Sequence, residues 1–341
     1  MFDGDILFAR TGASVGKSFI YRDSDGIVYF AGFLIRARIK MEYDAEFVFQ
    51  NTLCESYGKY IQITSQRSGQ PGVNAKEYSD YVFYLPTYDE QKKIGNFLHQ
   101  IDNLITLHQR KYDKLIKMKR AMLEKMFPKN GSLYPEIRFE GFTDAWEQRK
   151  LLDCIDKITD FRGRTPKKLG MDWSENGYLA LSALNVKDGY IDFTQDVHYG
   201  NQKLYDKWMS GNELHKGQVL FTTEAPMGNV AQVPDNKRYI LSQRTIAFSV
   251  TSNLITENFL AIILRSPNVV STLTALSSGG TAKGVSQKSL STVEITIPAD
   301  LEEQERLAST FLKLDNLITL HQRKLEKLKN IKKACLEKMF V

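Results

Sequence analysis

An internal repeat constrains this chain more than any other feature of its sequence. The ten residues DNLITLHQRK stand at positions 102–111 and return at 315–324, an offset of 213 residues. The identity extends outward, since LEKMF at 123–127 recurs at 336–340. Identity of this length does not arise by chance, so the chain contains two copies of one unit.

Upstream of these segments the repeat continues at lower identity. GDILF at 4–8 matches GQVLF at 217–221, and Pro86 matches Pro298. Each unit is therefore a variable region followed by a nearly constant one.

The two variable regions differ in length. About 75 residues precede Gly217 in the second unit, which begins near Phe139, whereas the first unit starts at Met1. By this register we expect the first unit to lack the counterpart of roughly Phe139–Asn212.

The constant segments are predicted to be long helices. Pro86 and Pro298 precede Thr87-x-x-Glu90 and Asp300-x-x-Glu303, which have the spacing of a helix-starting capping box. A helix of about 37 residues extends roughly 55 Å at 1.5 Å per residue. Apolar residues recur along both segments at alternating spacings of four and three, which is a heptad seam.

A helix of this length cannot bury its apolar stripe alone, and the other copy carries a matching stripe. We therefore predict that the two helices pack as an antiparallel coiled coil, with one variable domain held at each end. The residues predicted to carry this packing are Ile101, Ile105, His108 and Leu115 in the first helix, and Leu314, Ile318, His321 and Leu328 in the second.

Two histidines, His108 and His321, fall on this seam. They are either a functional pair or a polar position that sets the register, as a buried Asn does in other coiled coils. The second interpretation is favoured.

The charge of the chain is unevenly distributed. A net charge of +6 permits a nucleic-acid partner without requiring one. Residues 90–127 and 303–341 together carry about +9, which leaves about −3 for the rest. Any DNA contact by the variable regions must therefore be local. The basic helix faces are either solvated or turned toward phosphates or an acidic partner.

The second variable region mixes short strands with polar loops. Strands are predicted at Gln218–Thr222, Tyr239–Leu241, Thr245–Val250 and Val293–Ile297, and a short helix at Glu257–Leu264. The loops between them are rich in glycine, lysine and arginine. Neighbouring Gln and Arg side chains suit bidentate base contacts, and lysines suit phosphates.

Candidate DNA contacts come from these loops and from the corresponding part of the first unit. Any one of them is more often a solvated loop residue, and the group is more persuasive than its members. The candidates are Arg162, Arg164, Thr165, Lys167, Thr223, Gln243, Arg244, Lys283, Lys288, Arg10, Lys17 and Arg67.

The stretch GASVGKS at 12–18 resembles a phosphate-binding loop. Thr11 stands where that motif needs its first glycine, and PMGNV at 226–230, the matching stretch of the second unit, has no GKS. A nucleotide site is therefore disfavoured. The sequence contains no methyltransferase, dinucleotide-binding or nucleophile-elbow motif, so nothing in it nominates an active site.

The spacing of the cysteines and histidines does not predict a metal site. Cys54, Cys154 and Cys335 are far apart and form no CxxC pair, which fits a reducing compartment. No apolar run reaches the roughly 18 residues of a membrane span, and the N-terminus has no leader pattern. We expect a cytoplasmic chain with no membrane contact and no bound metal.

Several short stretches occur in a distinctive order. YPEIRF at 134–139 is followed by GFTDAWEQRKL at 141–151 and by GRTP at 163–166, and the junctions with the long helices read LPTYDEQ at 85–91 and IPADLEEQ at 297–304. In this order and layout the chain resembles the specificity subunits of type I restriction-modification systems. The resemblance covers essentially the whole chain.

The resemblance implies an α+β fold. Two α/β target recognition domains, the first one incomplete, are separated by two long conserved helices packed as an antiparallel coiled coil. The implied boundaries are 1–88 for the partial first domain, 89–127 for the first helix, 128–138 for a linker, 139–299 for the second domain and 300–341 for the second helix.

The resemblance also implies partners. Each target recognition domain reads one half of a bipartite site on double-stranded DNA, while the helices set the spacing and dock two methyltransferase subunits. Those subunits use S-adenosylmethionine, and two restriction subunits, which are translocase-nucleases, join with ATP and magnesium. The chain itself is expected to bind no cofactor and to catalyse nothing.

Two other hypotheses remain at this stage. The chain could be a truncated or silent copy that binds the methyltransferase without reading a complete site, or a cassette that donates its second domain by recombination. It could instead be an enzyme whose only support is the stretch at 12–18, in which case Lys17→Ala should abolish ATP binding.

Overall fold

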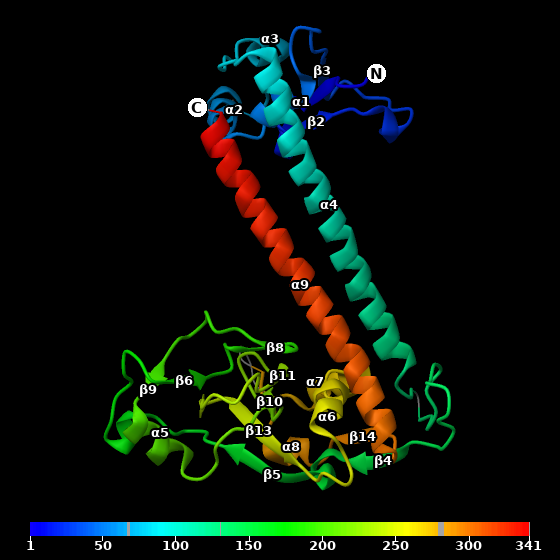
Figure 1. Cartoon of the computed structure of the whole chain (residues 1–341), viewed down its shortest axis with the longest axis vertical. Coiled ribbons are helices and arrows are strands. Elements are labelled where there is room, and N and C mark those ends of the chain that lie inside the picture. The colour runs from blue at the N-terminus through cyan, green and yellow to red at the C-terminus, as the bar shows by residue number, and fades with distance from the viewer. Residues whose placement is uncertain (67–68, 130, 279–282, 341) are drawn as a thin grey trace. The chain divides into compact units, whose positions relative to one another are not determined.

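The computed structural model describes residues 1–66, 69–129, 131–278 and 283–340. They form two compact units: unit 1 is Met1–Lys114 with Thr319–Val341, and unit 2 is Leu115–Ile318. Two long helices, α4 (Tyr88–Lys125) and α9 (Leu301–Met339), contribute residues to both units (Figure 1). The prediction of two long helices is confirmed.

The two helices run antiparallel in each unit. In unit 1, Lys332 Nζ near the end of α9 lies 2.6 and 2.8 Å from the carboxylate oxygens of Asp102, in the first half of α4. In unit 2, Lys119 Nζ near the end of α4 lies 2.7 Å from Asp315, in the first half of α9. The predicted antiparallel pairing is therefore confirmed.

The predicted seam lies between the helices. Ile101, Leu314 and Ile318 are buried, and Ile105, Leu115 and Leu328 are half-buried. Within unit 1 the two histidines face one another, with 2.8 Å between the Nδ1 atoms of His108 and His321. One neutral imidazole must donate to the other, which is what a register-setting polar pair requires.

This histidine pair should make the helix pairing in unit 1 sensitive to acid. Burial, the facing His108, and then Lys111 and Lys324 lower the pKa of His321. A histidine whose pKa is lowered by folding stabilises the folded state above its unfolded pKa of about 6.5, and the stabilisation is lost as the pH falls through the folded value. Two imidazolium rings cannot share the hydrogen bond, so the loss should be roughly 1 kcal/mol.

Hydrogen-exchange protection of residues 101–111 and 319–328 between pH 8 and pH 5 measures this effect. The double variant His108→Leu/His321→Leu keeps an apolar seam and should show a smaller loss of protection over the same range. An equal pH response in both proteins would assign the sensitivity to groups other than this pair.

Unit 1 is built on a three-stranded antiparallel sheet. Its strand order is β2-β1-β3, and β1 lies in the middle. The core under this sheet contains Ile6, Phe8, Tyr57 and Ile61. The elements are β1 (Ile6–Ala9), β2 (Ser18–Ile20), β3 (Leu34–Ala37), α1 (Ala45–Asn51), α2 (Glu55–Thr64), α3 (Ala75–Ser79) and the short 3-10 turns η1 (Gly12–Ser14) and η2 (Asp23–Asp25).

Unit 2 contains a four-stranded antiparallel sheet of order β11-β10-β13-β5. Along β10, Val219 and Phe221 point into one core while Leu220 points into a second core on the opposite face. This alternation is the two-residue period of a strand that is covered on both sides. The strands are β5 (Ile155–Asp160), β10 (Val219–Thr222), β11 (Val230–Gln232) and β13 (Thr245–Val250).

Smaller sheets and short helices complete unit 2. A mixed sheet has the order β12-β6-β9, and β14-β4 and β7-β8 are antiparallel pairs. These elements are β4 (Glu147–Lys150), β6 (Tyr178–Leu181), β7 (Val186–Lys187), β8 (Tyr190–Ile191), β9 (Tyr199–Gly200), β12 (Ile240–Leu241), β14 (Glu294–Ile297), α5 (Gln202–Met209), α6 (Glu257–Ile263), α7 (Pro267–Leu276), α8 (Gln287–Leu290), η3 (Leu151–Cys154) and η4 (Lys167–Leu169). The four strands and the helix predicted in this region are confirmed to within one residue at each end.

The start of α9 holds the segment that contains Arg138 and Trp146. Asp300 Oδ1 accepts from the backbone N–H groups of Glu302 (2.7 Å) and Glu303 (3.3 Å), so it caps the helix as predicted. A capping box would turn the Glu303 carboxylate back to Asp300. That carboxylate accepts from Arg138 at 2.7 and 2.8 Å and from the Trp146 indole at 3.3 Å.

Within the described ranges no single helix is long and apolar enough to cross a membrane, although α6 and α7 together meet the length and hydropathy requirement as a bent pair.

Candidate nucleic-acid interface

Three strand ends of the central sheet in unit 2 lie at one edge. Thr222 at the end of β10 pairs with Thr245 at the start of β13, and the neighbouring Ile246 pairs with Asp160 at the end of β5. The loops that follow β5 and β10 and precede β13 therefore emerge together. These loops carry most of the candidate DNA contacts.

Hydrogen bonds tie these loops, and the segment before α8, into one surface. Thr223 N–H donates to Arg244 O (2.8 Å), and Val285 N–H donates to Thr223 O (2.9 Å). Gln287 Nε2 donates to Asp160 Oδ2 (3.1 Å). We call the described residues of 160–167, 222–226, 242–244 and 283–288 the interface surface.

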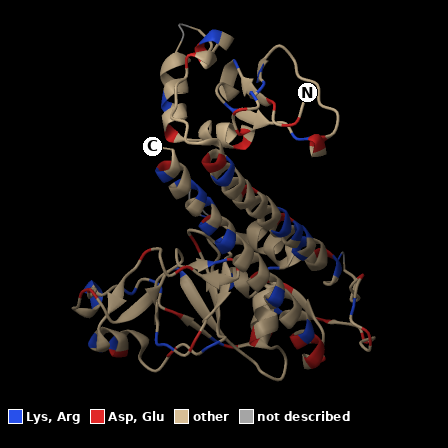
Figure 2. Cartoon of the chain, turned by 45° about the horizontal axis from the view of Figure 1, so that its top comes forward, with Lys and Arg blue, Asp and Glu red and all other residues tan. Residues whose placement is uncertain are grey.

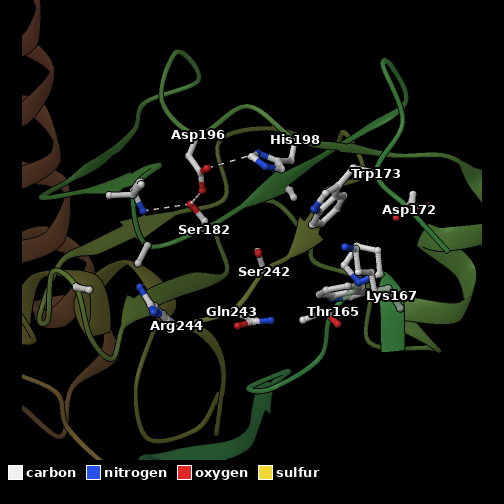
Figure 3. Close-up of a pocket in the computed structure, with 16 residues that line it drawn as sticks. Thr165, Lys167, Asp172, Trp173, Ser182, Asp196, His198, Ser242, Gln243 and Arg244 are labelled. Carbon is white, nitrogen blue, oxygen red and sulfur yellow. Dashed lines mark hydrogen bonds and ion pairs between the residues drawn. The ribbon is translucent and has the colours of Figure 1, made fainter. Parts of the chain in front are cut away.

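A hollow of about 390 Å³ lies in this surface. Its wall includes the aromatic rings of Trp173 and Trp208, whose centroids are 5.7 Å apart. The other lining residues that Figure 3 labels are polar: Thr165, Lys167, Asp172, Ser182, Asp196, His198, Ser242, Gln243 and Arg244. An apolar wall with a polar rim is the usual form of a ligand site, and here both signs of charge meet the hollow.

Four of the candidate DNA contacts line this hollow, namely Thr165, Lys167, Gln243 and Arg244. Arg244 keeps its guanidinium half-exposed beside Glu224, with Nε 3.2 Å from the carboxylate. Such a fork can bond two acceptors on one base edge.

Arg162 and Arg164 flank the hollow in different ways. Arg162 is exposed, and its guanidinium lies 3.6 Å from Asp160. The Arg164 guanidinium donates to Trp208 O and lies over the Phe161 ring at 4.4 Å from the centroid. The Arg164 side chain thus holds this loop against Trp208 and Phe161. The backbone carbonyl of Arg164 accepts a hydrogen bond from the Gln243 amide.

Thr223 differs from the expectation. Its residue is only 2% exposed, and its hydroxyl lies 3.3 Å from Arg244 O. It therefore fixes the loop that presents Arg244, and its burial prevents a direct contact with DNA. Thr223 directly follows the fully buried strand β10 and shares its burial, which the residue type alone does not indicate.

The remaining candidates are dispersed. Lys283 and Lys288 are exposed on the interface surface. Arg10 and Lys17 are exposed in unit 1, and Arg67 lies outside the described residues. The stretch at 12–18 leads from β1 through η1 into β2, whereas a phosphate-binding loop leads into a helix, so its geometry does not form a nucleotide cradle.

The sequence did not reveal the aromatic and acid–imidazole part of the hollow. Ser182 Oγ donates to Asp196 Oδ2 (2.6 Å), and His198 Nδ1 lies 3.5 Å from Asp196 Oδ1. The ring of His198 meets Trp173 edge to face at 5.5 Å between centroids. These residues come from three separate segments, and only Asp196 and His198 lie close together in the sequence.

Backbone conformation singles out the same hollow. Among the described residues, four non-glycine residues have a positive φ, and three of them line it: Asp196 (44°), Ala225 (49°) and Arg244 (64°). Such conformations are disfavoured for side chains larger than glycine and concentrate at functional sites.

Charge is distributed differently over the long helices and over the loops of unit 2. Lys and Arg lie along both long helices, while both signs alternate over the loops of unit 2 (Figure 2). In the part of the chain that the structure describes, no three His, Cys, Asp or Glu side chains cluster to hold a metal ion.

Known proteins resemble this chain along most of its length. The family model described as the type I restriction modification DNA specificity domain matches residues 1–117 and 143–330. The MjaVIII type I restriction enzyme specificity subunit of Methanocaldococcus jannaschii is 26% identical over 339 residues, which cover 97% of this chain and 77% of that protein. A putative MjaX specificity subunit of the same organism is 23% identical over 338 residues, covering 97% and 76%.

A solved structure shares the fold. The S subunit of a type I restriction-modification system from M. genitalium aligns with a TM-score of 0.62 at 14% identity, covering 100% of this chain and 84% of that one. Because the family model spans both units, the chain belongs to the family of type I restriction-modification DNA specificity subunits.

Proposed function

We propose that unit 2 reads one part of a double-stranded DNA site with the interface surface, and that unit 1 carries the equivalent surface for the other part. The observation that supports this most directly is the convergence of loops from separate parts of unit 2 around one strained, polar-rimmed hollow. Phosphate contacts by Lys283 and Lys288 position the duplex, and the fork of Arg244 with Gln243 reads base edges.

The internal repeat supports a two-part site. Arg10 O in unit 1 accepts from Val73 N–H (2.8 Å), just as Thr223 O accepts from Val285 N–H (2.9 Å) in unit 2. Two related domains match two half-sites, in the way that the symmetry of a dimeric repressor matches its operator. Because the variable regions differ in sequence, the two half-sites should differ as well.

The helices α4 and α9 have the second role. Their antiparallel pairing sets the separation of the half-sites, and their exposed basic faces dock two methyltransferase subunits, which supply S-adenosylmethionine chemistry. Two restriction subunits complete the assembly with ATP and magnesium. In this proposal the chain itself recognises and positions DNA and carries no reaction.

Co-expression with the methyltransferase subunit of the same system, followed by mapping of methylated positions in genomic DNA, tests the proposal. We expect a motif with two defined blocks separated by an undefined spacer. A single block, or a palindrome of one block, would limit reading to one unit. A stable complex that leaves DNA unmethylated would favour a silent copy, and failure to form any complex would contradict the role of the helices.

A further inference from the structure

The hollow in the interface surface has a shape that contacts with base edges do not require. In a duplex a protein reaches only the groove edges of the bases, because stacking covers their ring faces and pairing covers their Watson–Crick edges. The exposed fork of Arg244 suits such a groove edge. A recessed hollow of about 390 Å³ with an aromatic wall suits the face of a planar ring instead.

Trp173 forms part of that wall, and its ring is held in place. Trp173 is half-buried, and its ring packs on that of Trp208 with 5.7 Å between centroids and 36° between planes. Trp208 is fully buried, and its indole N–H donates to Leu241 O at 2.8 Å, so it cannot move aside. The edge-to-face contact with His198 is a second support. An aromatic ring fixed in this way is a preformed platform for stacking.

Polar groups of both kinds surround this platform (Figure 3). The Gln243 carboxamide donates to a backbone carbonyl in the loop after β5, which fixes the plane of the amide. Asp196 accepts from the Ser182 hydroxyl at 2.6 Å and lies 3.5 Å from His198. A Watson–Crick edge carries donors and acceptors side by side, so a rim that offers both can bond to it.

An apolar side chain at the same hollow gives independent support. Leu184 lines the hollow and is 47% exposed. Its position is fixed, because its N–H donates to Ser182 Oγ at 3.2 Å and the next residue, Asn185, is fully buried. Proteins that distort DNA insert exposed apolar side chains of this kind between base steps. Leu184 is therefore suited to occupy the gap that a displaced base leaves.

We propose that the hollow receives one base that leaves the duplex when unit 2 binds its half-site. The ring of the base stacks on Trp173, and its Watson–Crick edge bonds to the rim formed by Ser182, Asp196 and Gln243. Leu184 enters the base stack in its place. Base uptake rests on the proposed function, because it requires the interface surface to bind double-stranded DNA. It adds that one position is read as a whole base, while groove contacts read its neighbours.

A base from the DNA is favoured over a free nucleoside as the occupant. Four residues of the interface surface line the hollow, so a ring bound there sits where the duplex lies in the proposed function. A base that belongs to the bound duplex enters the hollow in an intramolecular step, whereas a free nucleoside must be captured from solution.

Duplexes with one unpaired base test base uptake, with the chain in complex with the methyltransferase subunit. Each position of the half-site read by unit 2 in turn receives an abasic site on the opposite strand, which frees the base without removing it. Because freeing the base removes the unpairing step, binding should tighten about tenfold at the position that enters the hollow. Fluorescence anisotropy of labelled duplexes measures the affinity.

Variants of unit 2 assign the gain, since methyltransferases also extract their own target base. Trp173→Ala should lose the gain at the unit 2 position, and Trp173→Phe, which keeps a stacking face, should retain most of it. Asp196→Asn is exposed and suits the same positive φ, so it preserves the fold and should reduce the gain as well. Phe193→Ala removes an exposed aromatic ring outside the hollow and should behave as the parent.

The outcomes distinguish base uptake from the proposed function. A parent complex that discriminates cognate duplexes but gains at no position in a way that depends on Trp173 would overturn base uptake alone. A parent complex that discriminates between no duplexes would overturn both. Free deoxynucleosides titrated into the chain alone test the other source. Saturable hydrogen-exchange protection around Trp173 and His198, without the gain on unpaired DNA, would assign the hollow to a soluble ligand and contradict base uptake.

Discussion

Replacing Arg265 by alanine should lower the free energy of unfolding of unit 2 by about 3–5 kcal/mol, because it breaks a buried ion pair with Asp315. The Arg265 side chain is only 6% exposed, and Nη1 lies 2.6 Å from Asp315 in α9. Its Nε donates to Asp188, in the turn between β7 and β8. Burial opposes the charge of Arg265, but the hydrogen bond to Asp315 and the charge of Asp188 outweigh it and raise the pKa.

This cluster connects three parts of unit 2. Lys119 of α4 lies 2.7 Å from the second oxygen of Asp315, so the carboxylate of one α9 residue holds both α4 and the segment after α6. Losing Arg265 leaves Asp315 with one cation and Asp188 with none at hydrogen-bond distance. The loss of stability therefore comes mainly from the carboxylates that lose a cation, and less from the removal of a single contact.

Tryptophan fluorescence during urea unfolding measures this effect without interference from unit 1, because Trp146, Trp173 and Trp208 all belong to unit 2. Arg306→Ala is the matched control, since that arginine is half-exposed and pairs with Glu302 within one helix, where such a pair contributes at most about 1 kcal/mol. The double variant Arg265→Met/Asp315→Leu removes one charge of each sign and should recover part of the loss. A single variant no less stable than the control would contradict the argument.

The sequence was sufficient for features that depend on local spacing. The seam of Ile101, Ile105, Leu314 and Ile318 follows from the heptad, and β10 and β13 follow from short apolar runs ended by polar loops. The polar loops rich in glycine, lysine and arginine also supplied Thr165, Lys167, Gln243 and Arg244 as candidates, and the structure places these four around one hollow.

What the sequence did not reveal depends on long-range contacts. Trp173 and His198 reach the hollow from loops whose course only the packed second core determines. Arg265 follows the predicted helix Glu257–Leu264 and received no role from the sequence, because its partner Asp315 lies 50 residues further along. Thr223 was assigned to DNA because it follows a strand, and only its burial shows that it supports the loop.

The interface surface predicts separate effects on affinity and on sequence discrimination. Arg244→Ala, assayed in the complex with the methyltransferase subunit, should weaken binding to the cognate site roughly 10–100-fold, which corresponds to the loss of one bidentate base contact of about 1–3 kcal/mol. Because non-cognate DNA lacks that contact, its affinity should change little. Arg244→Ala should therefore lower the ratio of cognate to non-cognate affinity. The methylated motif should lose its base preference at one base pair of the half-site.

Two further variants distinguish a specific contact with a base from simple attraction between a positive side chain and the DNA phosphates. Arg244→Lys retains the positive charge but loses the planar fork, so it should resemble Arg244→Ala in specificity while keeping the same dependence on salt as the parent. Lys288→Ala removes an exposed positive charge of the interface surface. It should weaken all sequences alike and reduce the slope of log affinity against log salt by about 0.9. If Arg244→Ala instead lowers the salt slope and leaves the methylated motif unchanged, Arg244 contacts phosphate, and the reading of base edges must lie with Gln243 and the other side of the hollow.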